Sequence, residues 1–291
     1  MPYVRLHAFP SPRPSHAHKP DHTAAKRELE KFVATVKKAV SAARAANTAA
    51  ANSVVVDRTG KSFPTIGAAI DSITDATQEK EYVVSAGPGT YNEVVTCKPW
   101  VFLTGAGLDQ TMITAVSAPD PNPSGIVKGA SNSAVQNCTI RATPAAGFFG
   151  AYVVAVNCQG TVNFDVENCE LFAGATSPTN IVGLMIDFPA SGKSGSQVNV
   201  AYTTVTAKDG SSPLALSTGW YTFVHGTESR FIAQGGNQPW GCAAVDQSFI
   251  LVENCYAEGV GYCLYQDDTA HVTANQCQLV GPVAPGVVVN N

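Results

Sequence analysis

A short phrase that returns six times constrains the fold of this chain more than any other feature. The phrase runs apolar residue, two spacers, small residue, one spacer, apolar residue, as in VQNCTI and VENCEL. Its small position returns at steps of 31, 34, 26, 26 and 22 residues and is held by Cys138, Cys169, Thr203, Ser229, Cys255 and Cys277. One such unit cannot bury its inner face alone, so successive units must stack. The repeat therefore predicts a β-solenoid.

The rest of residues 52–291 agrees with an all-β architecture. Short runs rich in Val, Thr and Gly alternate with turn residues, and helical periodicity ends near residue 75. We expect Asn137, Asn168 and Asn254, which precede three of the cysteines, to lie beside turns and to stack as an amide ladder. Long loops are expected at 188–197 and 206–219. The eight cysteines are expected to be buried free thiols.

Two segments precede this body. Residues 1–22 are rich in Pro and His, which predicts an extended arm, and no metal-site spacing surrounds the histidines. Residues 23–51 predict an amphipathic helix, because apolar residues from Leu29 to Ala43 recur at three- and four-residue steps. The helix could pack on its own body, pair in a coiled coil or dock on another protein. Candidate partner-binding residues are Arg5, Arg13, Lys26, Arg27, Lys37 and Lys38.

Charge is distributed unevenly along the chain. Residues 1–50 hold nine Lys/Arg and three Asp/Glu, whereas the remainder holds nine and nineteen. This asymmetry suggests that the basic segment contacts something acidic, although a solvated helix face beside an acidic domain would give the same pattern. The acidic body argues against nucleic-acid binding. The sequence predicts no membrane insertion and no secretory signal peptide, because long apolar runs are missing.

A family resemblance enters at residues 53–115. The stretches VVVDRTGKSFPTIGAAIDSI, GPGTYNEVV and VFLTGAGLDQTMIT resemble the opening of the pectin methylesterases, and NCTI and ENCYAEG resemble later coil phrases of that family. The resemblance implies a right-handed parallel β-helix over residues 52–291. It also implies a helix that plugs the N-terminal end, with Ile66, Ala69, Ile70 and Ile73 buried.

The same resemblance implies a catalytic set that this chain lacks. The family uses two aspartates on adjacent coils, glutamines that stabilise an oxyanion and a supporting arginine. Here the expected aspartate positions hold Gly236 and Tyr262, and no Lys or Arg follows Arg230. We therefore expect no pectin methylesterase activity and no cofactor.

Other chemistry remains open on the same coils. The candidate carboxylates are Asp187, Asp246, Asp267 and Asp268, and a pair formed by Asp246 and Asp267 could hydrolyse glycosides or bind a cation. Equally, aspartates at turns cap bends. A sugar-binding face could be lined by Trp220, Trp240, Tyr262 and Tyr265.

These observations favour a non-catalytic structural or attachment protein. The body would be anchored through residues 1–51 in a larger assembly, as a homo-oligomer with three copies as the expected number. A phage-like virion decoration or spike protein fits this description, with a virion location, or a cytoplasmic one otherwise. The alternatives are a carbohydrate-active enzyme with relocated carboxylates and a glycan-binding module.

Overall fold

The computed structural model describes residues 52–57, 62–117, 125–144, 152–175, 180–186, 195–267 and 269–291. The predicted arm (1–22) and amphipathic helix (23–51) lie outside these ranges. So do Asp187, Asp268 and most of the loop expected at 188–197.

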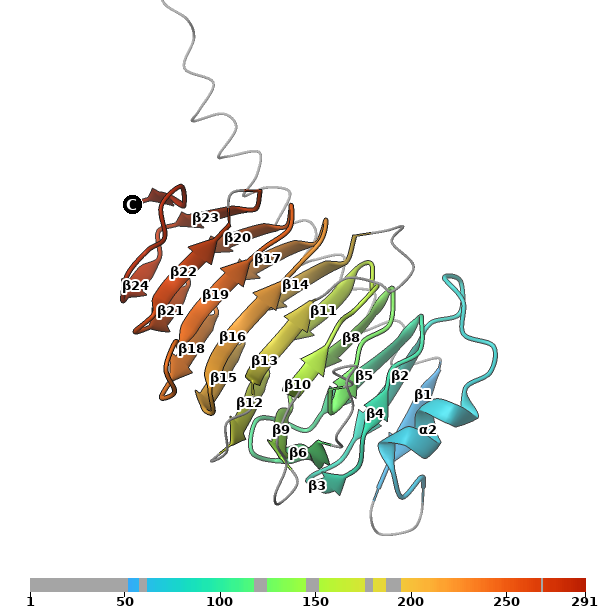
Figure 1. The fold of residues 1–291 in the computed structure, drawn as a ribbon. Helices are drawn as coiled ribbons and strands as arrows, with labels where there is room; N and C mark the ends of the chain where they lie inside the picture. The colour runs from blue at the N-terminus through green and yellow to red at the C-terminus, as the bar shows by residue number, and fades with distance from the viewer. Residues whose placement is uncertain are drawn as a thin grey trace, which may run out of the picture. The chain divides into compact units, whose positions relative to one another are not determined.

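The described residues form a right-handed parallel β-helix built from three parallel sheets (Figure 1). The chain visits the three sheets in turn, so strands far apart in sequence become neighbours, and every pairing between named strands is parallel. Parallel strands need crossover connections, and here the strands of the other two sheets supply them. The predicted fold is confirmed.

The ten-stranded sheet contains β1 (Ser53–Val56), β2 (Tyr82–Ala86), β5 (Val101–Gly105), β8 (Ser133–Gln136), β11 (Phe164–Glu167), β14 (Gln197–Ala201), β17 (Phe223–Thr227), β20 (Phe249–Glu253), β23 (His271–Asn275) and β25 (Val288–Asn290). The eight-stranded sheet contains β3 (Gly89–Asn92), β6 (Thr111–Ser117), β9 (Thr139–Pro144), β12 (Glu170–Ala175), β15 (Thr204–Asp209), β18 (Arg230–Gln234), β21 (Tyr256–Gly259) and β24 (Gln278–Val280). The seven-stranded sheet contains β4 (Val95–Thr96), β7 (Val127–Lys128), β10 (Tyr152–Asn157), β13 (Asn180–Ile186), β16 (Ser212–Thr218), β19 (Trp240–Ala244) and β22 (Tyr262–Gln266).

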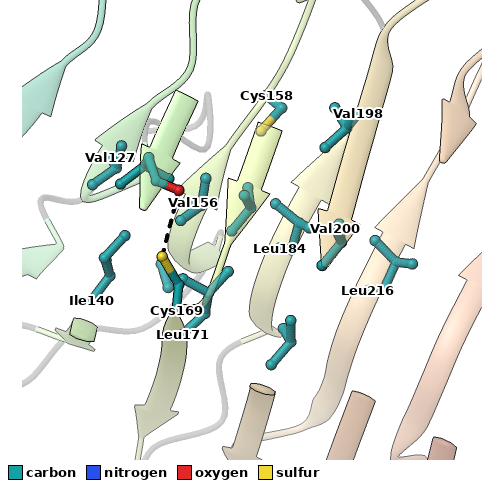
Figure 2. Close-up of a cluster of buried hydrophobic side chains, with 14 of the residues drawn as sticks. Val127, Ile140, Val156, Cys158, Cys169, Leu171, Leu184, Val198, Val200 and Leu216 are labelled. Carbon is teal, nitrogen blue, oxygen red and sulfur yellow. Dashed lines mark hydrogen bonds between the residues drawn. The ribbon is translucent and has the colours of Figure 1, made fainter. Parts of the chain in front are cut away.

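The core consists of residue columns that run from coil to coil. The second apolar position of the repeat pairs across successive strands in the order Ile140, Leu171, Val205, Phe231, Ala257 and Leu279. Figure 2 shows Ile140 and Leu171 among the buried side chains of neighbouring coils. Each fully buried aliphatic side chain contributes about 1.5–3 kcal/mol, so stacking stabilises every coil.

The first apolar position of the repeat forms a second inner column, and one glycine in it, Gly226, has a packing role. Gly226 stands between Val200 and Val252 in register. A Cβ at Gly226 would lie 3.2 Å from the ring of Phe231 and 3.0 Å from Val252. The missing side chain therefore makes room for the Phe231 ring, the bulkiest residue of its own column.

The small residues of the repeat do more than fill space. Thr203 and Ser229 each accept a backbone N–H from the preceding coil at 3.2 Å, and they donate to carbonyl oxygens of residues 201 and 227 at 2.9 and 2.8 Å. Thiols make longer versions of these bonds, including the one from Cys169 to the Val135 carbonyl at 3.5 Å, drawn in Figure 2. All eight cysteines, each within the described ranges, are free thiols.

A left-handed residue precedes each small residue and turns the chain. The residues with positive φ are Asn137, Asn168, Tyr202, Glu228, Asn254 and Gln276. Asn tolerates this conformation better than most residues, which accounts for its recurrence. The amide ladder forms where two asparagines are neighbours, because Asn168 donates to Asn137 at 2.8 Å. It does not extend to Asn254, since Tyr202 and Glu228 occupy the intervening coils.

The single described helix, α2 (Ile66–Ser72), is held at both ends by side chains from the next coil. Glu93 accepts the N–H groups of Ile66 and Gly67 at 2.9 and 2.8 Å. Lys98 donates to the carbonyls of residues 70, 71 and 73 at 3.0, 3.2 and 3.1 Å. These charges complement the helix dipole. The four residues expected to be buried by this plug, from Ile66 to Ile73, are buried, as predicted.

One expectation was wrong. Residues 206–219 were expected to form a long loop, but they belong to β15 and β16, joined by a tight turn at Gly210, where φ is 79°. The apolar residues of β16 are spread across both faces, so strict alternation does not mark this strand. Among the described residues there is no helix with the length and apolarity needed to span a lipid bilayer.

Candidate functional site

The expected catalytic positions can be placed on two neighbouring strands. Tyr262 begins β22, and its partner on β19 is Trp240. Gly236, the other expected position, lies in the turn before β19 with φ of 67°, where a Cβ would meet the Gly210 carbonyl and Pro213 at 2.7 Å. The residue at the same level as Tyr262 is therefore Trp240, because the intervening turn shifts the register by four residues.

Three of the four predicted sugar-binding aromatics gather at this place. The rings of Trp240 and Tyr265 are stacked, with centroids 4.5 Å apart and planes at 15°. Tyr262 lies 6.3 Å from Trp240 and 5.4 Å from Tyr265. All three side chains are half-buried. We call Trp240, Tyr262 and Tyr265 the aromatic triad. Such a cluster offers a flat apolar surface with a polar edge. The two strands that carry it, β19 and β22, contain no Asp or Glu.

Trp220 does not belong to the aromatic triad. It lies in the turn after β16, with φ of 40°, and 48% of its surface is exposed. Trp240 begins its strand, whereas Trp220 follows the end of a paired strand. The two tryptophans are therefore at opposite ends of the strands in the seven-stranded sheet.

In the Asp246/Asp267 pair, the Asp267 carboxylate accepts hydrogen bonds that hold a turn. Asp267 Oδ1 accepts the N–H groups of Thr269 and Ala270, both at 2.9 Å, and the Thr269 hydroxyl at 3.0 Å. Its Oδ2 accepts the backbone N–H of Asp246 at 2.9 Å. Desolvation opposes ionisation, but these hydrogen bonds together hold the pKa of Asp267 below its ordinary value. Asp267 therefore caps the turn and ties it to the preceding coil.

A further polar column was not found from the sequence. On the outer face of the ten-stranded sheet, His225 pairs with Glu253 at 2.8 Å, and Asn275 donates to the other Glu253 oxygen at 3.2 Å. Asn290 continues the column by donating to Asn275 at 2.8 Å. Glu253, Asn275 and Asn290 are in register on β20, β23 and β25, whereas His225 reaches Glu253 from two residues before the register partner of Glu253, which is Thr227. His225 is thus held by an acidic neighbour within this column.

Nothing in the described part of the chain gathers metal-binding side chains. No group of three or more His, Cys, Asp or Glu there is close enough to hold an ion. An open depression of about 590 Å³ at the N-terminal end is lined by residues 53–55 and 62–64. Those residues are Ser, Val, Phe and Pro, which offer no acid, base or thiol.

Comparison with known proteins supports the fold alone. No protein-family model matches the sequence, and neither does any curated protein. Pectin methylesterase from carrot is similar in structure, at 16% identity and a TM-score of 0.55, covering 82% of this chain and 88% of that one. The Aspergillus niger enzyme is 14% identical with a TM-score of 0.53, covering 83% of this chain and 85% of its own. The Erwinia chrysanthemi enzyme is 12% identical with a TM-score of 0.50, covering 83% and 93%.

Proposed function

We propose that this protein is a non-catalytic β-helix carried in a larger assembly by its basic N-terminal residues 1–51. A phage-like virion decoration or spike is the setting that fits best, with the protein present as a homotrimer. The body would supply a rigid surface, and the N-terminal residues would supply attachment.

The register of β19 and β22 is the observation that carries the proposal. It sets Trp240 beside Tyr262, and Tyr262 and Gly236 hold the two positions where the family resemblance implies aspartates. Ester hydrolysis by that mechanism needs a carboxylate nucleophile and a second carboxylate as acid and base. Two aromatic rings supply neither group. Asp267, which follows β22 at the opposite end from Tyr262, is engaged by four hydrogen-bond donors at a turn.

The charge distribution supports the assembly role. The N-terminal 50 residues carry a net charge of +6, against −10 for the remainder. A soluble solenoid must also protect its terminal coils. Here α2 covers the N-terminal end, whereas Val288 and Val289 of the last strand are 50% and 38% exposed.

The assembly role is tested by native mass in solution. The full-length chain should run as an oligomer, three chains by our proposal, whereas a chain beginning at Asn52 should have the mass of one body. Equal numbers of chains in both samples would refute a homo-oligomer built through residues 1–51.

Glycan binding without catalysis is the second candidate, and the aromatic triad is what favours it. Half-buried aromatic rings that keep part of their surface accessible can pack against the apolar side of a sugar. Trp240→Ala should abolish binding of a polygalacturonan oligosaccharide, measured by calorimetry, and Trp220→Ala serves as the matched control outside the triad. If the wild-type protein binds no such oligosaccharide, this candidate is dismissed for that ligand.

A further inference from the structure

The last coils expose an apolar patch on the outer face of the ten-stranded sheet. Phe223, Phe249 and His271 are lateral neighbours in register on β17, β20 and β23. Phe223 is 42% exposed and Phe249 is 47% exposed, and the Phe249 and His271 rings are 5.0 Å apart. Leu251 and Val288 lie on the same face, next to Thr273. We call Phe223, Phe249, Leu251, His271 and Val288 the outer patch.

The outer patch is confined to one part of the sheet. On β11 and β14 the same face carries a polar pair, since Asn199 donates to Asp165 at 2.7 Å. The alternate residues of β20, Ile250 and Val252, are buried in the core. Phe249 and Leu251 therefore point outward, and their exposure is not a consequence of loose packing. Large apolar side chains exposed together on one face are typical of interaction sites.

Acidic residues flank the patch at both ends of its strands. Asp246 and Asp267 lie in the turns before β20 and β23, and Glu253 ends β20 beside the exposed Glu228. Residues 219–291 contain six Asp/Glu and a single Lys/Arg, Arg230. The Arg230 guanidinium lies over the Tyr256 ring at 5.0 Å, on a different sheet. The patch therefore suits a partner that is apolar on one side and basic at its edges.

The N-terminal sequence of this chain has that composition. Residues 23–51 hold six Lys/Arg and two Asp/Glu, and their apolar stripe includes Leu29, Phe32, Val33, Val36 and Val40. As a helix, the stripe from Leu29 to Val40 would measure about 16 Å at 1.5 Å per residue. From β17 to β25 the patch spans three strand intervals, about 14 Å at 4.8 Å each. The segment and the outer patch therefore match in length and in apolar character, and their charges are opposite.

We propose that the outer patch binds the amphipathic segment 29–43 of a second copy of this chain. The inference rests on the proposed assembly role and assigns a receiving surface to it. Each copy then offers a basic apolar segment and receives one, which is a heterologous contact that closes into a ring when the rotation between copies allows it.

Zero-length cross-linking of the unmodified protein tests the occupant. A carbodiimide joins a carboxylate to a lysine in contact with it, so an equal mixture of ¹⁴N- and ¹⁵N-labelled chains distinguishes links between copies from links within one. We expect mixed-isotope links between Lys26, Lys31, Lys37 or Lys38 and an acid flanking the patch, Glu228 or Glu253. Links to these acids only within one chain would overturn the proposal, as would no link to them.

Substitution tests the surface. The double variant Phe223→Asp/Phe249→Asp in the full-length chain should lower the native mass to that of a single chain, 30.3 kDa for the wild-type sequence. Val116→Asp is the matched control, because Val116 is 58% exposed on a different sheet. An oligomer that survives the double variant overturns the patch as receiver. The assembly role itself fails by a different result, an oligomer that survives deletion of residues 1–51.

Discussion

Removing the carboxylate of Glu93 should loosen the N-terminal end of the β-helix. The α2 helix has seven residues, too few to be stable alone, so it depends on its contacts with the coils. Glu93 accepts two of its N-terminal N–H groups, at 2.9 and 2.8 Å. Charge-assisted bonds of this kind and N-terminal caps each contribute about 1–2 kcal/mol, so Glu93→Ala should lower the free energy of unfolding by about 2–3 kcal/mol.

Glu93→Gln separates charge from shape in the same experiment. Its amide keeps one acceptor oxygen and turns an N–H donor toward the second helix N–H, so about half of the loss should remain. Unfolding in urea, followed by circular dichroism, measures both variants, with Glu79→Ala at an exposed position as the control. A loss below about 0.5 kcal/mol for Glu93→Ala would refute the capping role. Equal losses for Ala and Gln would refute the importance of the second acceptor.

Three further results are expected. Asp267→Ala should destabilise the protein by about 1 kcal/mol at pH 7 in urea titrations. Because the folded pKa of Asp267 is lowered, the part of this difference that depends on its charge should be lost as the pH falls through the acidic range below about 4. The hydrogen bond with the Cys255 thiol lowers the pKa of Cys277 to about 7. Cys277 should therefore be alkylated first among the eight cysteines, at a rate that rises across pH 7. Peptide mass spectrometry follows this reaction. Gly226→Val should lower the urea midpoint, at a cost of about 2 kcal/mol, because the added methyl groups overlap the Phe231 ring, and an unchanged midpoint would contradict the packing argument.

The sequence was most informative where one physical requirement recurs. Ile140 and Leu171 could be assigned to one column because every coil must bury an apolar residue at the same level. The plug helix was predictable from the family resemblance, but the role of Glu93 was not. Its partners at residues 66 and 67 are 26–27 positions away, and only the return of the chain to the same end brings them together.

The candidate site depended on turn lengths, which the repeat does not specify. The turn at residues 235–238 sets Trp240, and not Gly236, level with Tyr262. The sequence could suggest that Asp246 and Asp267 form a pair, but it does not distinguish a turn cap from a catalytic pair, because the hydrogen bonds of Asp267 depend on the local turn. The outer patch had a visible signal, since Phe223 and Phe249 are 26 residues apart, the same step as Ser229 to Cys255.

Methanol release from methyl-esterified polygalacturonan measures whether this β-helix lacks esterase activity. The full-length protein should be assayed at high concentration beside its heat-denatured form, with the carrot pectin methylesterase as the positive control. We expect the same amount of methanol from the native and heat-denatured samples. Methanol released by the native protein alone would contradict this expectation, and loss of that release in Trp240→Ala or Asp267→Ala would locate the chemistry.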